Sequence, residues 1–190
     1  MDSIDLEVLK TCAQWIAAGK QCEMVTVIKT WGSSPRPEGA TLGICEDGHV
    51  VGSVSGGCIE DDLIERVRQH GITRTKPEVV TYGITADEAH RFGLPCGGTI
   101  QLSIEPLHSE SKIAELITRL ANHELIARRL DLQTGEVSLG PARAGMNLQI
   151  SEATYDHSWS ALEITHYWCW TVITLLSADC SRYGLFCDGL

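Results

Sequence analysis

Residues 53–60 read Ser-Val-Ser-Gly-Gly-Cys-Ile-Glu, a glycine-rich turn that leads into apolar residues at helical spacing. The spacing predicts a helix from Cys58 to His70 that ends at Gly71, because glycine is common just past a helix end. Upstream, Ala40 to Cys45 and His49 to Gly52 flank an Asp-Gly turn signal and predict a β-hairpin. A hairpin that passes through a glycine turn into a helix indicates a fold that combines both element types.

The rest of the chain supports this fold class. Helical and strand patterns follow one another, with several hairpins, so we predict a single α/β domain with one mixed sheet and flanking helices. The other predicted helices are 6–17, 86–92 and 109–122, and the other predicted strands are 22–30, 79–82, 99–105, 125–132, 137–139 and 148–155.

Length and charge restrict the class of protein. A chain of 190 residues is long enough for one domain with a hydrophobic core. Its net charge of -10 disfavours broad nucleic-acid binding and anionic membranes, because both need clustered Lys and Arg. The N-terminal residues lack the pattern of a signal peptide, so we expect a cytoplasmic protein with reduced cysteines. The eight cysteines contain no C-x-x-C pair, which disfavours a zinc ribbon.

The turn before the predicted helix is the first candidate for chemistry. The N–H groups of Gly56 and Gly57 are expected to face an anionic ligand, which the helix N-terminus also favours. The same field favours the thiolate of Cys58, a soft ligand suited to a thiophilic metal centre. Glu60 is expected to cap the helix or to act near the ligand. The alternative is a structural glycine turn with a buried cysteine.

A second candidate is residues 32–39, Gly-Ser-Ser-Pro-Arg-Pro-Glu-Gly. The prolines on either side of Arg36 stiffen the loop and present this side chain with the hydroxyls of Ser33 and Ser34. Arginine suits bidentate contact with phosphate or carboxylate. Taken alone, however, this segment is better explained as an ordinary surface turn.

Residues 93–98, Gly-Leu-Pro-Cys-Gly-Gly, place Cys96 against the paired glycines Gly97 and Gly98. Two loops that each set a cysteine beside Gly-Gly predict a shared cleft. We expect Arg36, Cys58 and Cys96 to line this cleft. In contrast, Cys12, Cys22 and Cys45 lie inside predicted elements and are expected to be core residues.

From Ser158 onward the sequence has neither a clear helical nor a clear strand period, so we predict a domain over 1–157 and a hydrophobic tail over 158–190. Tryptophan has the single codon TGG, and a forward shift of one base turns Trp168 and Trp170 into glycines. The shifted frame permits an apolar strand followed by Gly-Ala-Gly, as at the start of a dinucleotide-binding unit. Our hypothesis is that the tail is translated out of frame and that a Rossmann-like second domain is therefore absent. A stop codon at once in the shifted frame of the gene would contradict it.

Taken in order, these segments resemble the XdhC/CoxI family over about Ile4 to His157. The resemblance rests on Gly-Ser-Ser-Pro-Arg-Pro-Glu-Gly-Ala at 32–40, on Gly-Ser-Val-Ser-Gly-Gly-Cys-Ile-Glu at 52–60 after an Asp-Gly turn, and on Gly-Leu-Pro-Cys-Gly-Gly at 93–98 before a strand. Members of this family carry a Rossmann-type C-terminal domain that begins with an apolar strand and Gly-Ala-Gly. The apolar strand and Gly-Ala-Gly that the shifted frame permits lie at the position where members of the family begin that domain.

The resemblance implies a chaperone rather than an enzyme. Such proteins bind molybdenum cofactor, protect it while a sulfur ligand is installed, and pass it to xanthine or carbon monoxide dehydrogenase-type apoenzymes. It also implies a homodimer and a cysteine desulfurase as a further partner, whereas NAD(P) binding is not expected without the second domain. Cys58 would be the molybdenum-proximal thiol. The other residues implied to line the cofactor are Ser33, Ser34, Arg36, Gly56, Gly57, Glu60, Cys96, Gly97 and Gly98.

Three alternatives stay open at this point. The chain is a fragment of a nicotinamide-dependent oxidoreductase, a sulfur transferase that uses a persulfide on Cys58, or an interaction module without a small ligand. Binding of molybdenum cofactor that a Cys58→Ala change weakens, without turnover, distinguishes the chaperone from both enzymes.

Overall fold

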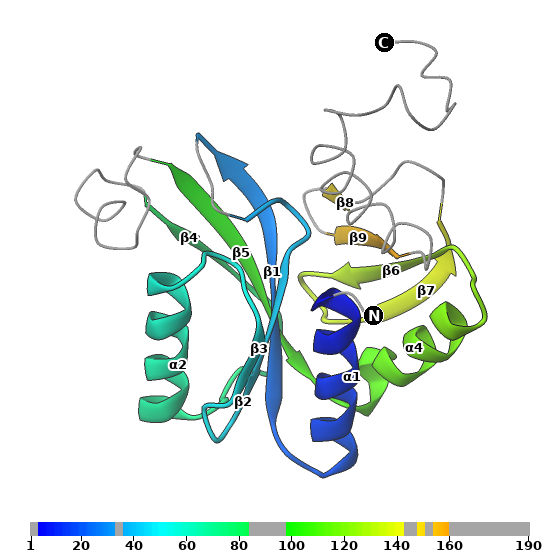
Figure 1. Ribbon diagram of the computed structural model, residues 1–190, viewed down its shortest axis with the longest axis horizontal. Coiled ribbons are helices and arrows are strands. Elements are labelled where there is room, and N and C mark those ends of the chain that lie inside the picture. Colours follow the sequence, from blue (N-terminus) through cyan, green and yellow to red (C-terminus); the bar gives the residue numbers. More distant parts are fainter. Residues whose placement is uncertain (1–3, 33–35, 84–97, 143–147, 151–153, 160–190) are drawn as a thin grey trace, which may run out of the picture.

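A computed structural model of the chain describes residues 4–32, 36–83, 98–142, 148–150 and 154–159. Its strands form two sheets, one of five strands in the order β3-β2-β1-β5-β4 and one of four strands in the order β7-β6-β9-β8 (Figure 1). The strands of the five-stranded sheet are β1 (Cys22–Trp31), β2 (Thr41–Cys45), β3 (Val50–Gly52), β4 (Glu78–Tyr82) and β5 (Thr99–Leu107). Those of the four-stranded sheet are β6 (Ile126–Asp131), β7 (Val137–Pro141), β8 (Leu148–Ile150) and β9 (Thr154–Trp159). The helices are α1 (Ile4–Ala17), α2 (Cys58–His70) and α4 (Ile113–Ala121), with a 3-10 turn η1 (Ser109–Ser111).

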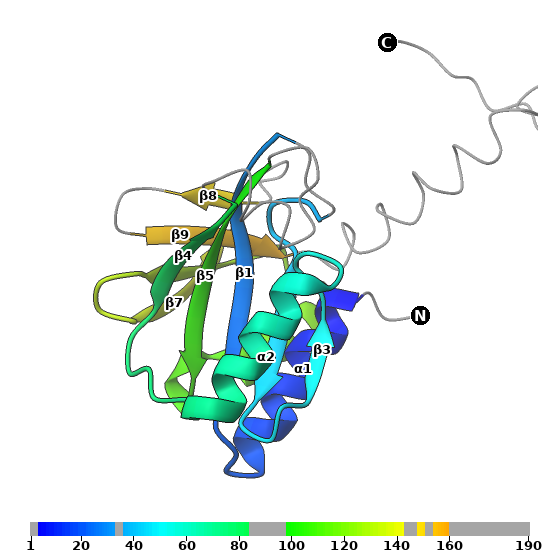
Figure 2. The same cartoon turned by 90° about the vertical axis from the view of Figure 1, so that its left-hand side faces the viewer.

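Different helices cover the two faces of the five-stranded sheet. α2 lies on one face, where its residues Ile59, Leu63 and Val67 are buried against alternate residues of β1, β2 and β5. α1 and α4 lie on the other face, where Val8 and Leu116 belong to a second buried cluster (Figures 1 and 2). Successive side chains of a strand point to opposite faces of the sheet. Because apolar side chains occur on both faces of these strands, the sheet is buried on both sides.

α1 lies close against β2 because of Gly43. A Cβ atom at this position would lie 2.7 Å from Sγ of Cys12 and 3.3 Å from the Trp15 ring. These distances are shorter than van der Waals contact, so only glycine fits at this crossing.

The second sheet is tied to the first by a buried ion pair. Arg128 of β6 donates to both carboxylate oxygens of Glu105 on β5, in one case from Nη1 at 2.9 Å. It also donates from Nε and Nη2 to the Ser111 carbonyl, each at 3.1 Å. Both charged side chains are at most 3% exposed, so each depends on the other for its neutralisation.

The predicted α/β class is confirmed, and the sheets differ from the expected single mixed sheet. Every strand pair among the described residues is antiparallel. α2 connects β3 at one edge of the first sheet to β4 at the opposite edge, so this helix does not join parallel neighbours. Short hairpins join antiparallel strands, whereas parallel neighbours need a long crossover connection.

Most predicted elements are present with shifts at their ends. The predicted strand 148–155 is two strands, β8 and β9, which pair with each other. The predicted helix 109–122 begins as η1 and becomes α4 only after Lys112, which has a left-handed φ of 57°. β9 continues to Trp159 opposite Ile126, two residues past the predicted boundary at 157. The predicted helix 86–92 and residues 160–190 lie outside the described part of the chain.

Candidate functional site

Gly32 and Gly98, which belong to the motifs at 32–39 and 93–98, lie side by side at one end of the five-stranded sheet. β1 ends at Trp31, which pairs with Thr99 at the start of β5. The glycines that follow and precede these residues approach so closely that a Cβ atom on Gly32 would lie 3.3 Å from Cα of Gly98. The pairing of β1 with β5 therefore brings together Gly32 and Gly98, which are more than sixty positions apart in the sequence.

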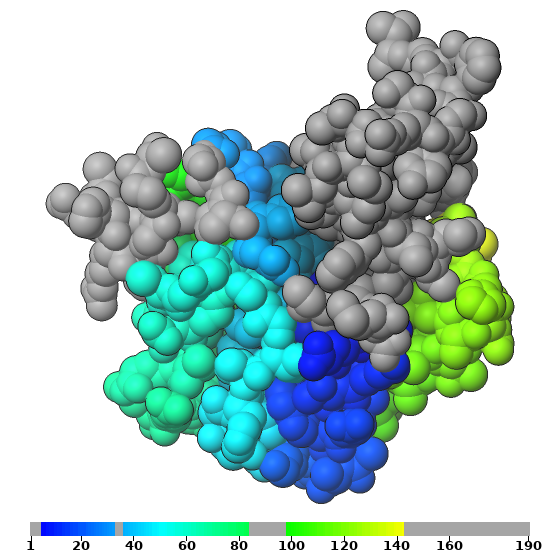
Figure 3. Space-filling model, in the orientation of Figure 1, coloured from blue at the N-terminus to red at the C-terminus, as the bar shows by residue number. Residues whose placement is uncertain are grey.

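The turn before α2 begins where β3 ends, beside the start of β2 (Figure 1). Its first residue, Ser53, donates its N–H to the Thr41 carbonyl at 3.0 Å. Arg36, from the loop between β1 and β2, donates from Nε to the Ser53 carbonyl at 3.3 Å. The surface of residues 36–57 lies between those of α2 and α1 (Figure 3). The half-buried Arg36 side chain is thus attached to the turn that carries Cys58.

Glu60 organises this turn from within. Its carboxylate accepts hydrogen bonds from the N–H groups of Val54 at 2.9 Å, Ser55 at 2.8 Å, Gly56 at 3.0 Å and Gly57 at 2.9 Å. The hydroxyls of Ser53, at 2.8 Å, and Ser55 donate to it as well. The turn wraps around the side chain of a residue in the first turn of the following helix, which is a capping arrangement.

The surroundings of Glu60 favour its ionised carboxylate. Its side chain is buried, with the residue 8% exposed. Burial alone would raise the pKa of this carboxyl, but the hydrogen bonds from Ser55 and Ser53 outweigh burial and hold the pKa well below its ordinary value. At neutral pH a negative charge therefore lies at the positive end of the α2 dipole.

The N–H groups of Gly56 and Gly57 were expected to face a ligand, and in the structure they donate to Glu60. The expected capping role of Glu60 is the one observed. No described atom lies within 4 Å of a Cβ atom added at Gly56 or Gly57, and both glycines are exposed. The turn is held by its hydrogen bonds to Glu60 and presents these glycines on its outer side.

Cys58 is the first residue of α2 and its thiol is exposed and free. The other described cysteines, Cys12, Cys22 and Cys45, are free but buried, as expected for core residues. Burial raises the pKa of the Cys12 and Cys45 thiols, and it raises that of Cys22 to about 12. Only Cys58 among these cysteines is accessible to a ligand.

The remaining predicted site residues fall into two groups. Gly98 is buried beside Gly32 and belongs to the same end of the sheet. Ser33, Ser34, Cys96 and Gly97 lie outside the described residues, so the predicted cleft between Arg36, Cys58 and Cys96 stays a prediction.

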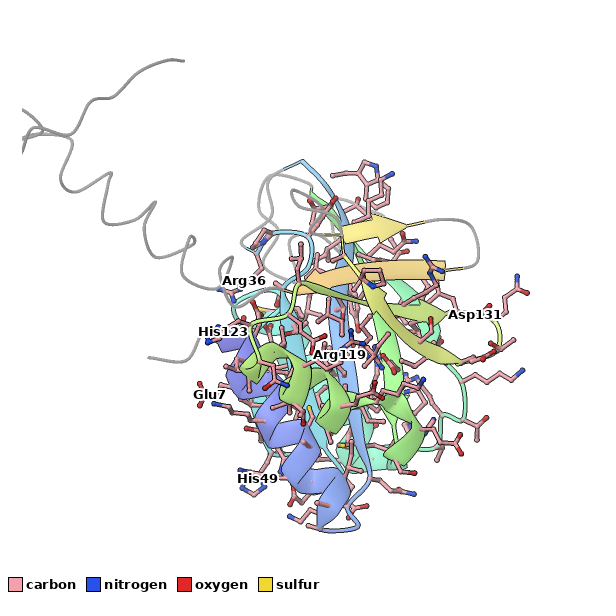
Figure 4. The ribbon with its side chains drawn as sticks, turned by 90° about the vertical axis from the view of Figure 1, so that its right-hand side faces the viewer. Glu7, Arg36, His49, Arg119, His123 and Asp131 are labelled. Atoms are coloured by element: carbon pink, nitrogen blue, oxygen red, sulfur yellow. The ribbon has the colours of Figure 1, made fainter. Side chains whose placement is uncertain are left out.

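Asp5 is a residue of this region that sequence reasoning missed. It lies in the first turn of α1, and its Oδ1 accepts a hydrogen bond from Thr41 Oγ1 at 3.1 Å. Burial raises the pKa of Asp5, while the Thr41 hydrogen bond and the charge of Arg36 offset part of this rise. Arg36 lies above the N-terminal turn of α1, which also carries Glu7 (Figure 4). An acidic residue in a first helical turn is common, so no separate signal marks Asp5 in the sequence.

Within the described ranges, no group of three or more His, Cys, Asp or Glu side chains is arranged to hold a metal ion. No helix in the same ranges is both long and apolar enough to cross a bilayer.

Residues 15–83 match the family model described as the XdhC and CoxI family. The chain is 31% identical over 144 residues to the molybdenum cofactor insertion chaperone PaoD of Escherichia coli (strain K12), a match that covers 74% of this chain and 44% of PaoD. It is 25% identical over 95 residues to a probable xanthine dehydrogenase subunit of Bacillus subtilis (strain 168), covering 49% of this chain and 28% of that protein. A crystal structure of a xanthine dehydrogenase from Bacillus halodurans has a similar fold, with a TM-score of 0.59 and 25% identity over 82% of this chain and 52% of that chain. The chain spans less than half the length of the curated relatives it matches.

Proposed function

We propose that this chain, whose residues 15–83 match the model of the XdhC and CoxI family, binds molybdenum cofactor and delivers it to a xanthine or carbon monoxide dehydrogenase-type molybdenum hydroxylase. The observation that carries the proposal is the exposed Cys58 thiol on a turn fixed by Glu60, with Arg36 hydrogen-bonded to the same turn. The similarity to PaoD, a molybdenum cofactor insertion chaperone, supports this direction.

The donor set suits the cofactor, which is the cargo in this proposal. Molybdenum cofactor is an anionic pterin with a phosphate group and a molybdenum centre bound through sulfur. A thiol is a soft ligand for such a centre, and a guanidinium is a suitable partner for phosphate. In the proposal Cys58 contacts the molybdenum centre and Arg36 contacts the phosphate, while Glu60 acts through the backbone as a positioning residue.

The other predicted site residues remain part of the proposal. Ser33 and Ser34 precede Arg36 by three and two positions in the sequence and would add hydroxyl donors to the phosphate. Gly98 lies beside Gly32, and Cys96 and Gly97, which precede it in sequence, are proposed to line the same site. Gly56 and Gly57 would contribute their open outer surface rather than their N–H groups, because these donate to Glu60.

The proposed transfer of the cofactor requires partner proteins. A carrier needs a site that holds its cargo and can also release it, and a few contacts on an open turn suit both needs better than a closed cage. The recipient is the molybdenum hydroxylase apoenzyme, and a cysteine desulfurase is proposed as the sulfur donor. We propose a homodimer that acts in the cytoplasm, where free thiols such as Cys58 persist. NAD(P) binding has no place in this proposal.

The test is retention of molybdenum by the purified chain. The protein is mixed anaerobically with molybdenum cofactor and separated by gel filtration, and molybdenum in the protein peak is measured by mass spectrometry. We expect the wild type to retain molybdenum and Arg36→Ala to lower the affinity about tenfold or more, because a hydrogen bond to a charged group is lost. Cys58→Ser is expected to weaken retention while preserving the fold.

Arg68→Ala is the matched control, since Arg68 is an exposed arginine in the last turn of α2, away from the site. Failure of the wild type to retain molybdenum would overturn the proposal, as would equal retention by Arg36→Ala and Arg68→Ala. Catalytic sulfur transfer through a persulfide on Cys58 would favour the sulfur transferase instead.

A further inference from the structure

A short chain of contacts connects Asp5 with Arg36. Thr41 donates its hydroxyl to Asp5 Oδ1 at 3.1 Å, and its carbonyl accepts the N–H of Ser53 at 3.0 Å. The carbonyl of Ser53 in turn accepts Nε of Arg36 at 3.3 Å. The N-terminal turn of α1, the start of β2 and the two loops of the candidate site therefore meet at one place.

The two charged groups act on each other. The charge of Arg36 lowers the pKa of Asp5, against the larger effect of burial, which raises it. Electrostatic interaction is mutual, so an ionised Asp5 carboxylate reduces the positive potential that an anion meets at Arg36. The partial burial of this pair limits screening by salt.

We propose that Asp5 sets how tightly, and over which pH range, Arg36 binds an anionic group, an inference that rests on the proposed cofactor site. An ionised Asp5 competes with the anion for the charge of Arg36, whereas a protonated Asp5 does not. By linkage, anion binding favours the protonated carboxyl, so that binding takes up a proton. Loss of that proton weakens the hold on the anion and so assists release.

Other charged groups around α1 differ from Asp5 in exposure or in chemistry. On α1 itself, Glu7 is exposed and Lys10 carries a positive charge. At the start of α2, Glu60 stays ionised because the turn donates hydrogen bonds to it. α4, which packs against α1, carries Arg119 in its last turn, and the exposed His123 follows the helix. Histidine is the side chain type that changes charge near neutral pH, so a His123→Gln background removes this contribution from the measurement.

The test uses sulfate, whose charge is constant between about pH 5 and pH 8, as the probe. Sulfate is titrated into the full chain and its Kd is obtained from the NMR shift of the Arg36 Nε–H group. We expect the affinity of the wild type to rise as the pH falls, and Asp5→Asn to bind sulfate about three- to tenfold more tightly at neutral pH with little pH dependence. Asparagine keeps an oxygen that accepts the Thr41 hydroxyl, and circular dichroism checks the fold.

Glu7→Gln is the matched control, because it removes an exposed charge from the same helical turn. Equal sulfate affinity and equal pH dependence of Asp5→Asn and Glu7→Gln would overturn the inference, as would absence of sulfate binding at Arg36. The gain must also disappear when Asp5→Asn is combined with Arg36→Ala. The molybdenum retention experiment remains separate: retention by the wild type with no effect of Asp5→Asn on sulfate refutes the role of Asp5 alone, whereas failure to retain molybdenum refutes the proposed function.

Discussion

Arg36 and Ser53 are 17 positions apart, and Arg36 donates from Nε to the Ser53 carbonyl at 3.3 Å. This contact attaches the loop after β1 to the turn before α2. The same turn is held from its other side by Glu60, which accepts the hydroxyl of Ser53 at 2.8 Å. Ser53 is therefore the point at which the arginine loop and the cysteine helix are joined, and changes on either side of it are informative.

Glu60→Ala is expected to destabilise the protein by about 2–4 kcal/mol, because it leaves several N–H groups of the turn without their acceptor. The free energy of unfolding is measured by urea denaturation. Asp61→Ala, which removes an exposed neighbour from the same helical turn, is the control and is expected to change stability little. Equal effects of the two substitutions would contradict the role given to Glu60.

The pH dependence of stability provides a second test of Glu60. Its pKa is lowered in the folded state from the ordinary value of 4.5, so its contribution is fully present above that pH. The contribution is lost as the pH falls below 4.5 towards the folded-state pKa, because the unfolded chain then binds the proton first. Glu60→Gln should reduce the slope of unfolding free energy against pH below this value, as measured in urea titrations. An unchanged slope would show that Glu60 is not held in its charged form.

Alkylation should separate Cys58 from the buried cysteines. Cys58 is exposed, whereas Cys12, Cys22 and Cys45 are buried and burial raises the pKa of each of these three thiols. In the native protein near neutral pH, iodoacetamide is expected to modify Cys58 first, because the accessible thiolate is the reactive form. Peptide mass spectrometry follows each site, and the denatured protein is the control in which the differences disappear. Native modification of Cys22 as fast as Cys58 would refute the assignment.

Gly43→Ala tests the close contact of α1 with β2. The added Cβ would lie 2.7 Å from Sγ of Cys12, and we expect a loss of about 1–3 kcal/mol in stability from overpacking. Gly140→Ala in β7 is the control, since no atom of the described residues lies within 4 Å of its added Cβ. Combining Gly43→Ala with Cys12→Ala should restore part of the loss in urea denaturation. A Gly43→Ala variant as stable as Gly140→Ala would show that the helix lies farther from the sheet.

The buried pair of Arg128 and Glu105 is predicted to be costly to break. Glu105→Ala leaves the guanidinium of Arg128 buried without its carboxylate, and a loss of about 3–5 kcal/mol is expected. Replacing both residues, with Arg128→Met and Glu105→Leu, should cost less than the single change because no buried charge remains. Urea denaturation of the single and double variants makes the comparison. A double variant as unstable as Glu105→Ala would argue against a buried pair.

The sequence by itself determined the local elements and the residues that carry chemistry. The helix of α2, its end at Gly71, the hairpin before it and the pairing of Cys58 with a glycine turn follow from spacing and turn chemistry within a few residues. The sequence also predicted three core cysteines, because Cys12, Cys22 and Cys45 lie inside apolar elements. All three are buried.

Only the tertiary structure decided which strands meet and what each charged group faces. Two antiparallel sheets in place of one mixed sheet depend on hydrogen bonds between segments far apart in the chain, and local periods do not specify these partners. The N–H groups of Gly56 and Gly57 are accepted by Glu60 rather than left for a ligand. Asp5 comes within electrostatic reach of Arg36 only because α1 packs over β2. Burial and long-range contact set these relationships, since the strength of a charge interaction depends on distance and surroundings in space and not on separation along the chain.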